Sequence, residues 1–191
     1  MTKEELSILI NSDLYRYEGQ VSPKYKVMQY FRNPGFKYTY ILRKCRYYKQ
    51  RKFYILQYIF FKYLLKKYTI RYGYEIHENV RIGKGFYICH IGGIVINPKS
   101  IIGNNVNITK GVTIGQANRG AKMGAPIIGD KVWIGTNASI VGKIRIGDNV
   151  LIAANSFVNF DVPSNSIVIG NPAKIYSNEK ATESYINNIF N

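Results

Sequence analysis

Aliphatic residues recur every six positions through the second half of this 191-residue chain. The thirteen positions are Ile76, Ile82, Ile88, Ile94, Ile102, Ile108, Ile114, Ile128, Ile134, Ile140, Ile146, Ile152 and Val158. A period of six fits neither an amphipathic helix nor a flat strand. It is typical of a β-helix, in which each hexapeptide supplies one short strand and three hexapeptides make one coil. We therefore predict a mainly β fold, a left-handed parallel β-helix; an ordinary sandwich of short strands is the alternative.

The six-residue register breaks at two places. Two extra residues fall between Ile94 and Ile102, and eight fall within an inserted loop at residues 115–127. An insertion into a repeat forms a loop on one face, and that face often binds the ligand. The loop carries Arg119 and Lys122, which we expect to contact the substrate. A solvated loop without function is the alternative.

Breakers divide the first part of the chain into helical segments. Pro23 and the turn at residues 33–35 predict helices near residues 3–16, 24–32, 36–50 and 53–69. A short amphipathic helix is also predicted over residues 179–190. The predicted organisation is an α-helical N-terminal region at 1–72, the β-helix at 73–176 and a C-terminal tail with its helix at 177–191.

Charge and tyrosine are concentrated in the predicted helical region. Residues 1–72 hold 16 Lys/Arg against 4 Asp/Glu, and they hold 13 of the 17 tyrosines. Segment 43–71 flanks an apolar centre with cations, a composition typical of a helix on anionic lipid. The alternative is that these helices cap the β-helix and bury their aromatic rings between subunits. No nucleic-acid recognition motif accompanies the charge, so we expect no nucleic-acid partner.

The sequence also bears on location. No run reaches the roughly 20 apolar residues that a membrane-spanning helix needs, and the N-terminus does not resemble a signal peptide. Two cysteines, Cys45 and Cys89, make no disulfide framework. We expect a cytoplasmic protein, with peripheral contact at the inner face of the membrane as an open alternative.

Cys89 and His90 are adjacent in a chain that holds only two of each residue type. Neighbours in an extended chain point to opposite faces, so they are poorly placed to form a reactive pair. No spacing supplies four zinc ligands, so we expect no metal site. An exposed imidazole accepts protons readily near neutral pH, which makes His90 a candidate general base. Glu75 lies one 18-residue coil before position 93 and is a candidate to orient His90, although a merely solvated carboxylate is the alternative. His77 is expected to be structural.

Three motifs resemble those of the hexapeptide acyltransferases, namely the serine acetyltransferases and related O-acetyltransferases of capsule and exopolysaccharide synthesis. The motifs are GYEIHENVRIGKGFYICHIGGIVIN, GVTIG with its following loop, and IGNPAKI. The resemblance implies a homotrimer that binds acetyl-CoA between subunits. It implies that His90 is the base and that Glu75 stands where an aspartate orients it. The residues implied in acetyl-CoA binding are Gly115, Gly135, Thr136, Ala153, Ala154 and Lys174.

Two departures from the serine acetyltransferase pattern concern the acceptor. The aspartate before the catalytic histidine is Cys89 here, and an Arg-His pair before Pro126 is Gly124-Ala125. A serine site must neutralise an ammonium and a carboxylate, and buried unpaired charge is costly. We therefore predict an acetyl-CoA-dependent O-acetyltransferase acting on a sugar or polysaccharide-precursor hydroxyl, with Cys89 as a wall of the acceptor pocket. Serine O-acetylation is the first alternative, and a non-catalytic trimeric scaffold or membrane-surface protein is the second.

Overall fold

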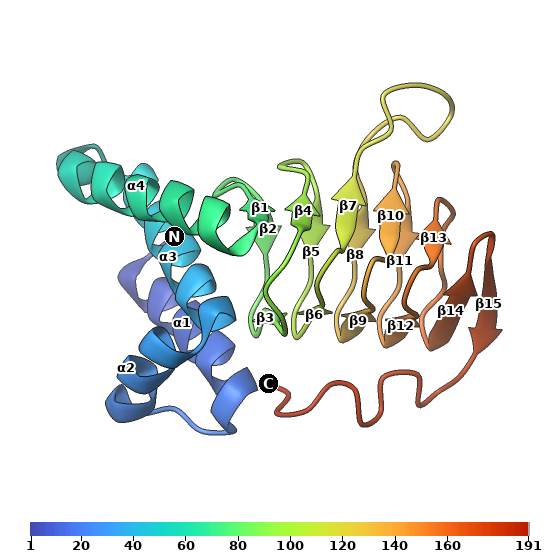
Figure 1. Cartoon of the computed structure of the whole chain (residues 1–191), viewed down its shortest axis with the longest axis horizontal. Coiled ribbons are helices and arrows are strands. Elements are labelled where there is room, and N and C mark those ends of the chain that lie inside the picture. The colour runs from blue at the N-terminus through green and yellow to red at the C-terminus, as the bar shows by residue number, and fades with distance from the viewer. Residues whose placement is uncertain (191) are drawn as a thin grey trace.

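The computed structural model describes residues 1–190 and shows four α-helices beside a three-sided parallel β-helix (Figure 1). The helices are α1 (Lys3–Glu18), α2 (Pro23–Arg32), α3 (Pro34–Lys49) and α4 (Ile55–Tyr72), with a short 3-10 helix η1 (Lys52–Tyr54) before α4. The predicted fold class and the predicted N-terminal helices are confirmed. Within the described residues, no helix is both long enough and apolar enough to span a membrane.

Successive coils of the solenoid give short strands to three sheets, and the last coil reaches sheet B only through an isolated bridge between Ile146 and Val162. Sheet A consists of β1 (Tyr74–Ile76), β4 (Ile94–Ile96), β7 (Thr113–Gly115), β10 (Ser139–Val141) and β13 (Phe157–Val158). Sheet B consists of β2 (Arg81–Ile82), β5 (Ile101–Ile102), β8 (Ile127–Ile128) and β11 (Arg145–Ile146). Sheet C consists of β3 (Tyr87–Ile88), β6 (Asn107–Ile108), β9 (Val132–Ile134), β12 (Val150–Ile152), β14 (Ser166–Gly170) and the antiparallel β15 (Ala173–Ser177).

The inward-pointing aliphatic residues stack in rows along the solenoid axis and form its core. In sheet A, β1 pairs with β4 so that Ile96, and not Ile94, continues the row that begins at Ile76. Both Ile94 and Ile96 are buried, so the six-residue period could not choose between them. The two extra residues consequently fall between Ile88 and Ile96, and the prediction that they follow Ile94 is wrong. The lengthened turn is the one that carries His90.

Asparagines form many of the tight corners of the solenoid. Six non-glycine residues of the solenoid have φ between 53° and 60°, namely Asn105, Lys131, Asn137, Asn149, Asn155 and Asn165. Asparagine adopts this left-handed backbone conformation more readily than other side chains do. The recurring asparagines of the hexapeptides are therefore explained by the turns that they make.

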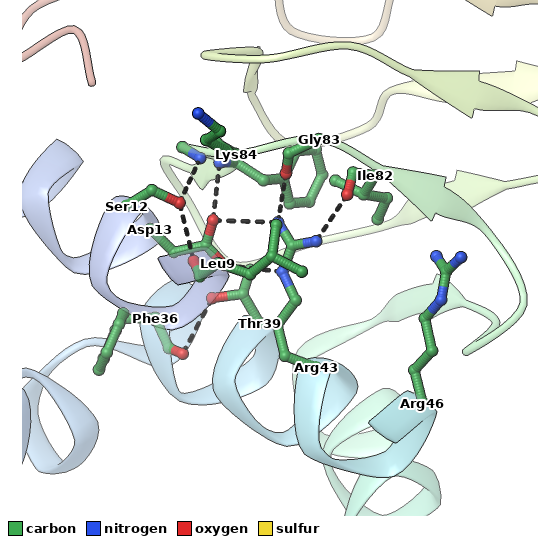
Figure 2. Close-up of polar contacts among 12 residues, drawn as sticks. Leu9, Ser12, Asp13, Phe36, Thr39, Arg43, Arg46, Ile82, Gly83 and Lys84 are labelled. Carbon is green, nitrogen blue, oxygen red and sulfur yellow. Dashed lines mark hydrogen bonds and ion pairs between the residues drawn. The ribbon is translucent and has the colours of Figure 1, made fainter. Parts of the chain in front are cut away.

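The helices cap the open end of the solenoid. The first coil has no coil before it, so the outer backbone groups of that coil need other partners. Arg43 of α3 donates to the carbonyl oxygens of Ile82 (2.7 Å) and Gly83 (2.6 Å), and two of its nitrogens each lie 3.1 Å from the Asp13 carboxylate (Figure 2). Asp13 of α1 also accepts from the amide of Phe86 at 2.9 Å. A buried ion pair thus takes the place of a neighbouring strand.

The C-terminal tail contains turns, and the helix predicted for residues 179–190 is wrong. The tail runs back past the solenoid to α1 (Figure 1). The side-chain amides of Asn105, Asn107 and Asn149 donate to backbone carbonyl groups of the tail at 2.8–3.2 Å. The bonds to Glu179 and Tyr185 occupy carbonyl groups that a helix over residues 179–190 would need for its own hydrogen bonds, so the solenoid corners compete successfully with helix formation.

Candidate functional site

His90 is exposed, on the turn between β3 and β4 at the edge where sheet C meets sheet A. Its backbone is held on both sides. The Tyr74 hydroxyl donates to the His90 carbonyl oxygen at 3.1 Å, and the Cys89 amide donates to β6 at 3.0 Å. The Tyr17 hydroxyl donates to the Ile88 carbonyl oxygen at 3.1 Å and accepts from the Ile88 amide at 3.3 Å. The His90 imidazole forms no hydrogen bond with residues 1–190, which leaves it available to accept a proton from a substrate.

Glu75 is not hydrogen-bonded to His90 among the described residues. It is exposed on the outer face of β1, where its partner in β4 is Val95. It borders a cavity of about 330 Å³ beside α4, together with His77. The longer turn after β3 explains the difference, because it makes the first coil longer than the 18 residues on which the pairing of Glu75 with His90 rested.

Cys89 borders a polar pocket of about 340 Å³ that His90 does not border. Arg16, Tyr17 and Trp133 line this pocket, and the C-terminal tail closes one side of it. Burial raises the pKa of the Cys89 thiol from 9 to about 11, although the Arg16 cation opposes the shift. The thiol is therefore neutral at physiological pH, and the thiolate that a nucleophilic role requires is scarce.

Sequence reasoning missed two side chains that hold the site, Asp13 and Tyr17. Both project from α1 into the first coil, Asp13 to the Phe86 amide and Tyr17 to Ile88. A signal was available, because both residues lie on the apolar stripe of α1 that the buried side chains of Leu6, Ile10 and Leu14 define. A polar residue on a buried stripe needs a hydrogen-bond partner elsewhere.

Four of the residues implied in acetyl-CoA binding lie on the same edge as His90. Gly135 and Thr136 follow β9, and Ala153 and Ala154 follow β12 one coil further on. A Cβ atom on Gly135 would lie 2.6 Å from the amide nitrogen of Ala154, so the close approach of these coils requires glycine. The edge presents backbone groups and small side chains, which an extended ligand can lie against.

Lys174 lies at the far end of sheet C. It pairs with Ile169 in the β14–β15 hairpin and is exposed. Sheet C places β3, β6, β9, β12 and β14 side by side. At about 4.8 Å for each step, β3 and β14 are about 19 Å apart. His90 and Lys174 thus lie toward opposite ends of one long edge.

Gly115 and the inserted loop lie at a different edge. Gly115 ends β7, where sheet A meets sheet B, and the loop projects from this point (Figure 1). Arg119 is exposed, and the Lys122 ammonium donates to the carbonyl oxygen of Asn159 at 2.8 Å. A single chain therefore does not bring Gly115, Arg119 or Lys122 to the edge that carries His90.

Comparison with known proteins relates this geometry to characterised enzymes. The family model described as bacterial transferase hexapeptide (six repeats) matches residues 125–159. A serine acetyltransferase of Staphylococcus aureus is 45% identical over 103 residues, which make up 54% of this chain and 48% of that protein. The structure of Neisseria gonorrhoeae serine acetyltransferase in complex with serine matches with a TM-score of 0.74 and 33% identity, over 92% of this chain and 70% of that one. The serine acetyltransferase of Brucella abortus strain S19 in complex with coenzyme A matches with a TM-score of 0.76 and 28% identity, over 92% and 69%.

The chain spans about half the length or less of the curated relatives it matches. These comparisons contradict the predicted sugar or polysaccharide acceptor, because the relatives and the structural neighbours are serine acetyltransferases. The prediction rested on Cys89, Gly124 and Ala125. Those residues show that charge is missing at three positions, and they do not exclude charged partners supplied from elsewhere, such as Arg119 or Lys122.

Proposed function

This chain belongs to the hexapeptide-repeat acyltransferase family, and we propose that it is an acetyl-CoA-dependent serine O-acetyltransferase. The observation that carries the proposal is the match to a serine acetyltransferase in complex with serine over 92% of this chain, at 33% identity. A second match, to an enzyme of the same kind in complex with coenzyme A, supports the choice of donor. The exposed, backbone-anchored His90 supplies the base that this reaction needs.

We assign the donor substrate, acetyl-CoA, to the long edge between sheets C and A. The pantetheine arm lies along Gly135, Thr136, Ala153 and Ala154, whose small side chains leave the backbone accessible. Lys174 lies toward the end remote from His90, where a cation can pair with the phosphates of the nucleotide. This arrangement brings the thioester toward His90.

The chemistry that we propose is direct transfer in a ternary complex. The His90 imidazole takes the proton of the serine hydroxyl as the hydroxyl oxygen attacks the thioester carbonyl carbon. A C–O bond forms, the tetrahedral intermediate collapses, and the C–S bond breaks. Coenzyme A leaves as a thiolate and takes the proton from the imidazolium, which restores neutral His90.

The acceptor carries two charges of its own. Arg119 and Lys122 of the inserted loop are the cations that we assign to the serine carboxylate. Cys89 has a neutral thiol, and we assign it to the wall of the acceptor pocket. Glu75 remains a candidate to orient His90 or to pair with the serine ammonium, although no hydrogen bond joins Glu75 and His90 in the described single chain.

We propose a homotrimer, which the positions of these groups support. Gly115 and the loop lie at one edge of sheet A, and His90 lies at the other. His90 of one copy and the loop of its neighbour can contact one ligand when the edge of one copy lies against the opposite edge of the next. Val95 and Phe157 on the outer face of sheet A are each 37% exposed in the single chain, which leaves apolar surface for such packing.

The test is serine-dependent release of coenzyme A from acetyl-CoA by the purified full chain. We expect turnover with L-serine, and we expect His90→Ala to lower kcat by about 10²–10⁴-fold. His77→Ala is the matched control, because His77 is the other histidine of the chain and should leave the rate near that of the unmodified protein. Absence of a serine response, or equal rates in His90→Ala and the unmodified chain, would overturn the proposal.

A further inference from the structure

The outward side of α4 is apolar and uncovered in the structure. The exposed large side chains there are Leu56, Ile59, Phe60 and Tyr63, each 56–76% exposed. Phe53, just before the helix, is 99% exposed. These five residues are named the α4 patch. A cluster of exposed apolar side chains of this kind marks an interaction surface more often than scattered single residues do.

Lysines stand at both ends of the α4 patch. Lys52 precedes it, and Lys66 and Lys67 follow it. All three are exposed, and none takes part in an ion pair within residues 1–190. Residues 23–72 contain 14 Lys/Arg and no Asp/Glu. The patch therefore lies in a segment of the chain that carries cations and no acidic residue.

A groove between α2 and α4 extends the apolar surface. It has a volume of about 380 Å³, and its lining includes Val27, Phe31 and Phe60. Val27 and Phe31 are themselves 60% and 72% exposed. Lys26 is the cation at this groove. The apolar surface thus continues from one helix to the next, with positive charge beside it throughout.

The apolar surface and the lysines beside it together indicate the kind of partner that binds here. A second copy of the chain would bring two acid-free surfaces together, and like charges in an interface cost several kcal/mol. A nucleic acid would pair with the lysines but would leave the α4 patch uncovered. An anionic bilayer satisfies both, because apolar side chains enter the boundary of the acyl chains while lysines reach the phosphates. We propose that α4 docks on an anionic membrane surface and lies in the plane of the interface.

The position of the patch is compatible with catalysis. The patch begins at the end of α4 farthest from the solenoid, while the long edge with His90 and Lys174 runs along the solenoid (Figure 1). Docking therefore leaves that edge in solution.

The test is co-sedimentation of the full chain with vesicles of phosphatidylcholine, either pure or mixed with phosphatidylglycerol. We expect binding to the mixed vesicles at low salt and its loss near 1 M salt, where the screening length is about 3 Å. The double variant Lys66→Gln with Lys67→Gln should lower the partition coefficient of a single copy about thirtyfold, because each lysine contributes about 1 kcal/mol to membrane binding. Leu56→Glu with Phe60→Glu should abolish binding.

Ile175→Glu is the matched control, because Ile175 is 39% exposed and lies at the opposite end of the solenoid (Figure 1). Circular dichroism checks that every variant is folded, and the lysine variants change only exposed side chains. Three outcomes would overturn the proposal: no binding to the mixed vesicles, equal binding to both kinds of vesicle at every salt concentration, or a change of oligomeric mass in Leu56→Glu with Phe60→Glu. The last outcome would assign the patch to a second copy of the chain.

Discussion

At the residue scale, Glu78 is a buried carboxylate held by two lysines. Its side chain is 1% exposed, and the ammonium groups of Lys62 and Lys49 lie 2.7 and 3.2 Å from its two oxygens. Burial alone would raise the pKa of Glu78, but hydrogen bonds from Lys62 and Lys49 outweigh this and lower the pKa from 4.5 to about 2. The charged form is therefore favoured in the folded protein.

A prediction about pH follows from Glu78. Because its pKa is lower in the folded state, the stabilisation is complete above pH 4.5 and is lost as the pH falls toward 2. We expect the free energy of unfolding to decrease by about 2–3 kcal/mol over this range, after allowing for partial solvent screening of the lysines. Glu78→Gln should remove most of this decrease, as measured by urea unfolding at a series of pH values.

Glu75→Gln is the control for the same series. Glu75 is exposed and forms no ion pair within the described residues, so its replacement should leave the pH dependence unchanged. If Glu78→Gln kept the full dependence, the carboxylate responsible would lie elsewhere in the chain.

At the scale of elements, the cap formed by α1 and α3 determines whether the first coil is ordered. Arg43 makes two bonds to Asp13 and two to the backbone of β2 and the turn after it. We expect Arg43→Lys to lower the free energy of unfolding by about 3 kcal/mol or more, because lysine cannot form this planar set of bonds and leaves buried acceptors unpaired. Urea unfolding measures the loss.

Arg46→Lys is the matched control for Arg43→Lys. Arg46 lies one helical turn further along α3 (Figure 2). Among residues 1–190 its side chain donates only to the carbonyl oxygen of Val80, at 2.5 Å. Its replacement should cost about 1 kcal/mol. Equal losses in the two variants would show that the bidentate contact with Asp13 adds nothing to the cap.

The elements differ in how far the sequence reveals them. The solenoid strands follow from a period that repeats locally, and the helices follow from Pro23 and the turn at residues 33–35. The register around Ile94 and Ile96 could not be derived, because both residues are apolar and both fit the inner face. The cap could not be derived either, since Asp13 meets Phe86 across 73 positions of sequence and such contacts leave no local pattern.

The candidate site was predictable to a similar extent. His90 was found because a histidine on a solenoid corner is rare in this chain and because it lies in a motif shared with a known family. The shared edge of Thr136 and Ala154 follows from one full coil of separation. Whether Glu75 contacts His90 depends on the exact length of one turn, which the six-residue period does not fix.

At the scale of the whole molecule, the proposed site is divided between two edges of sheet A. His90 is on one edge and Gly115 on the other, so one chain alone cannot close the site. A mixture of two inactive variants tests this. His90→Ala removes the base, and Gly115→Glu obstructs the other edge with little disturbance of the fold, because a Cβ atom there meets only Thr113 and Val141 at 3.7 Å.

We expect each variant alone to be inactive and an equal mixture, unfolded and refolded together, to regain about a quarter of the activity. A site between copies is intact when one chain contributes His90 and its neighbour contributes Gly115. Each condition is met by half of the chains in a random mixture. Refolding each variant separately before mixing is the control and should give no recovery. If both edges of one site came from a single chain, joint refolding would give no activity either, and the proposal of a divided site would be wrong.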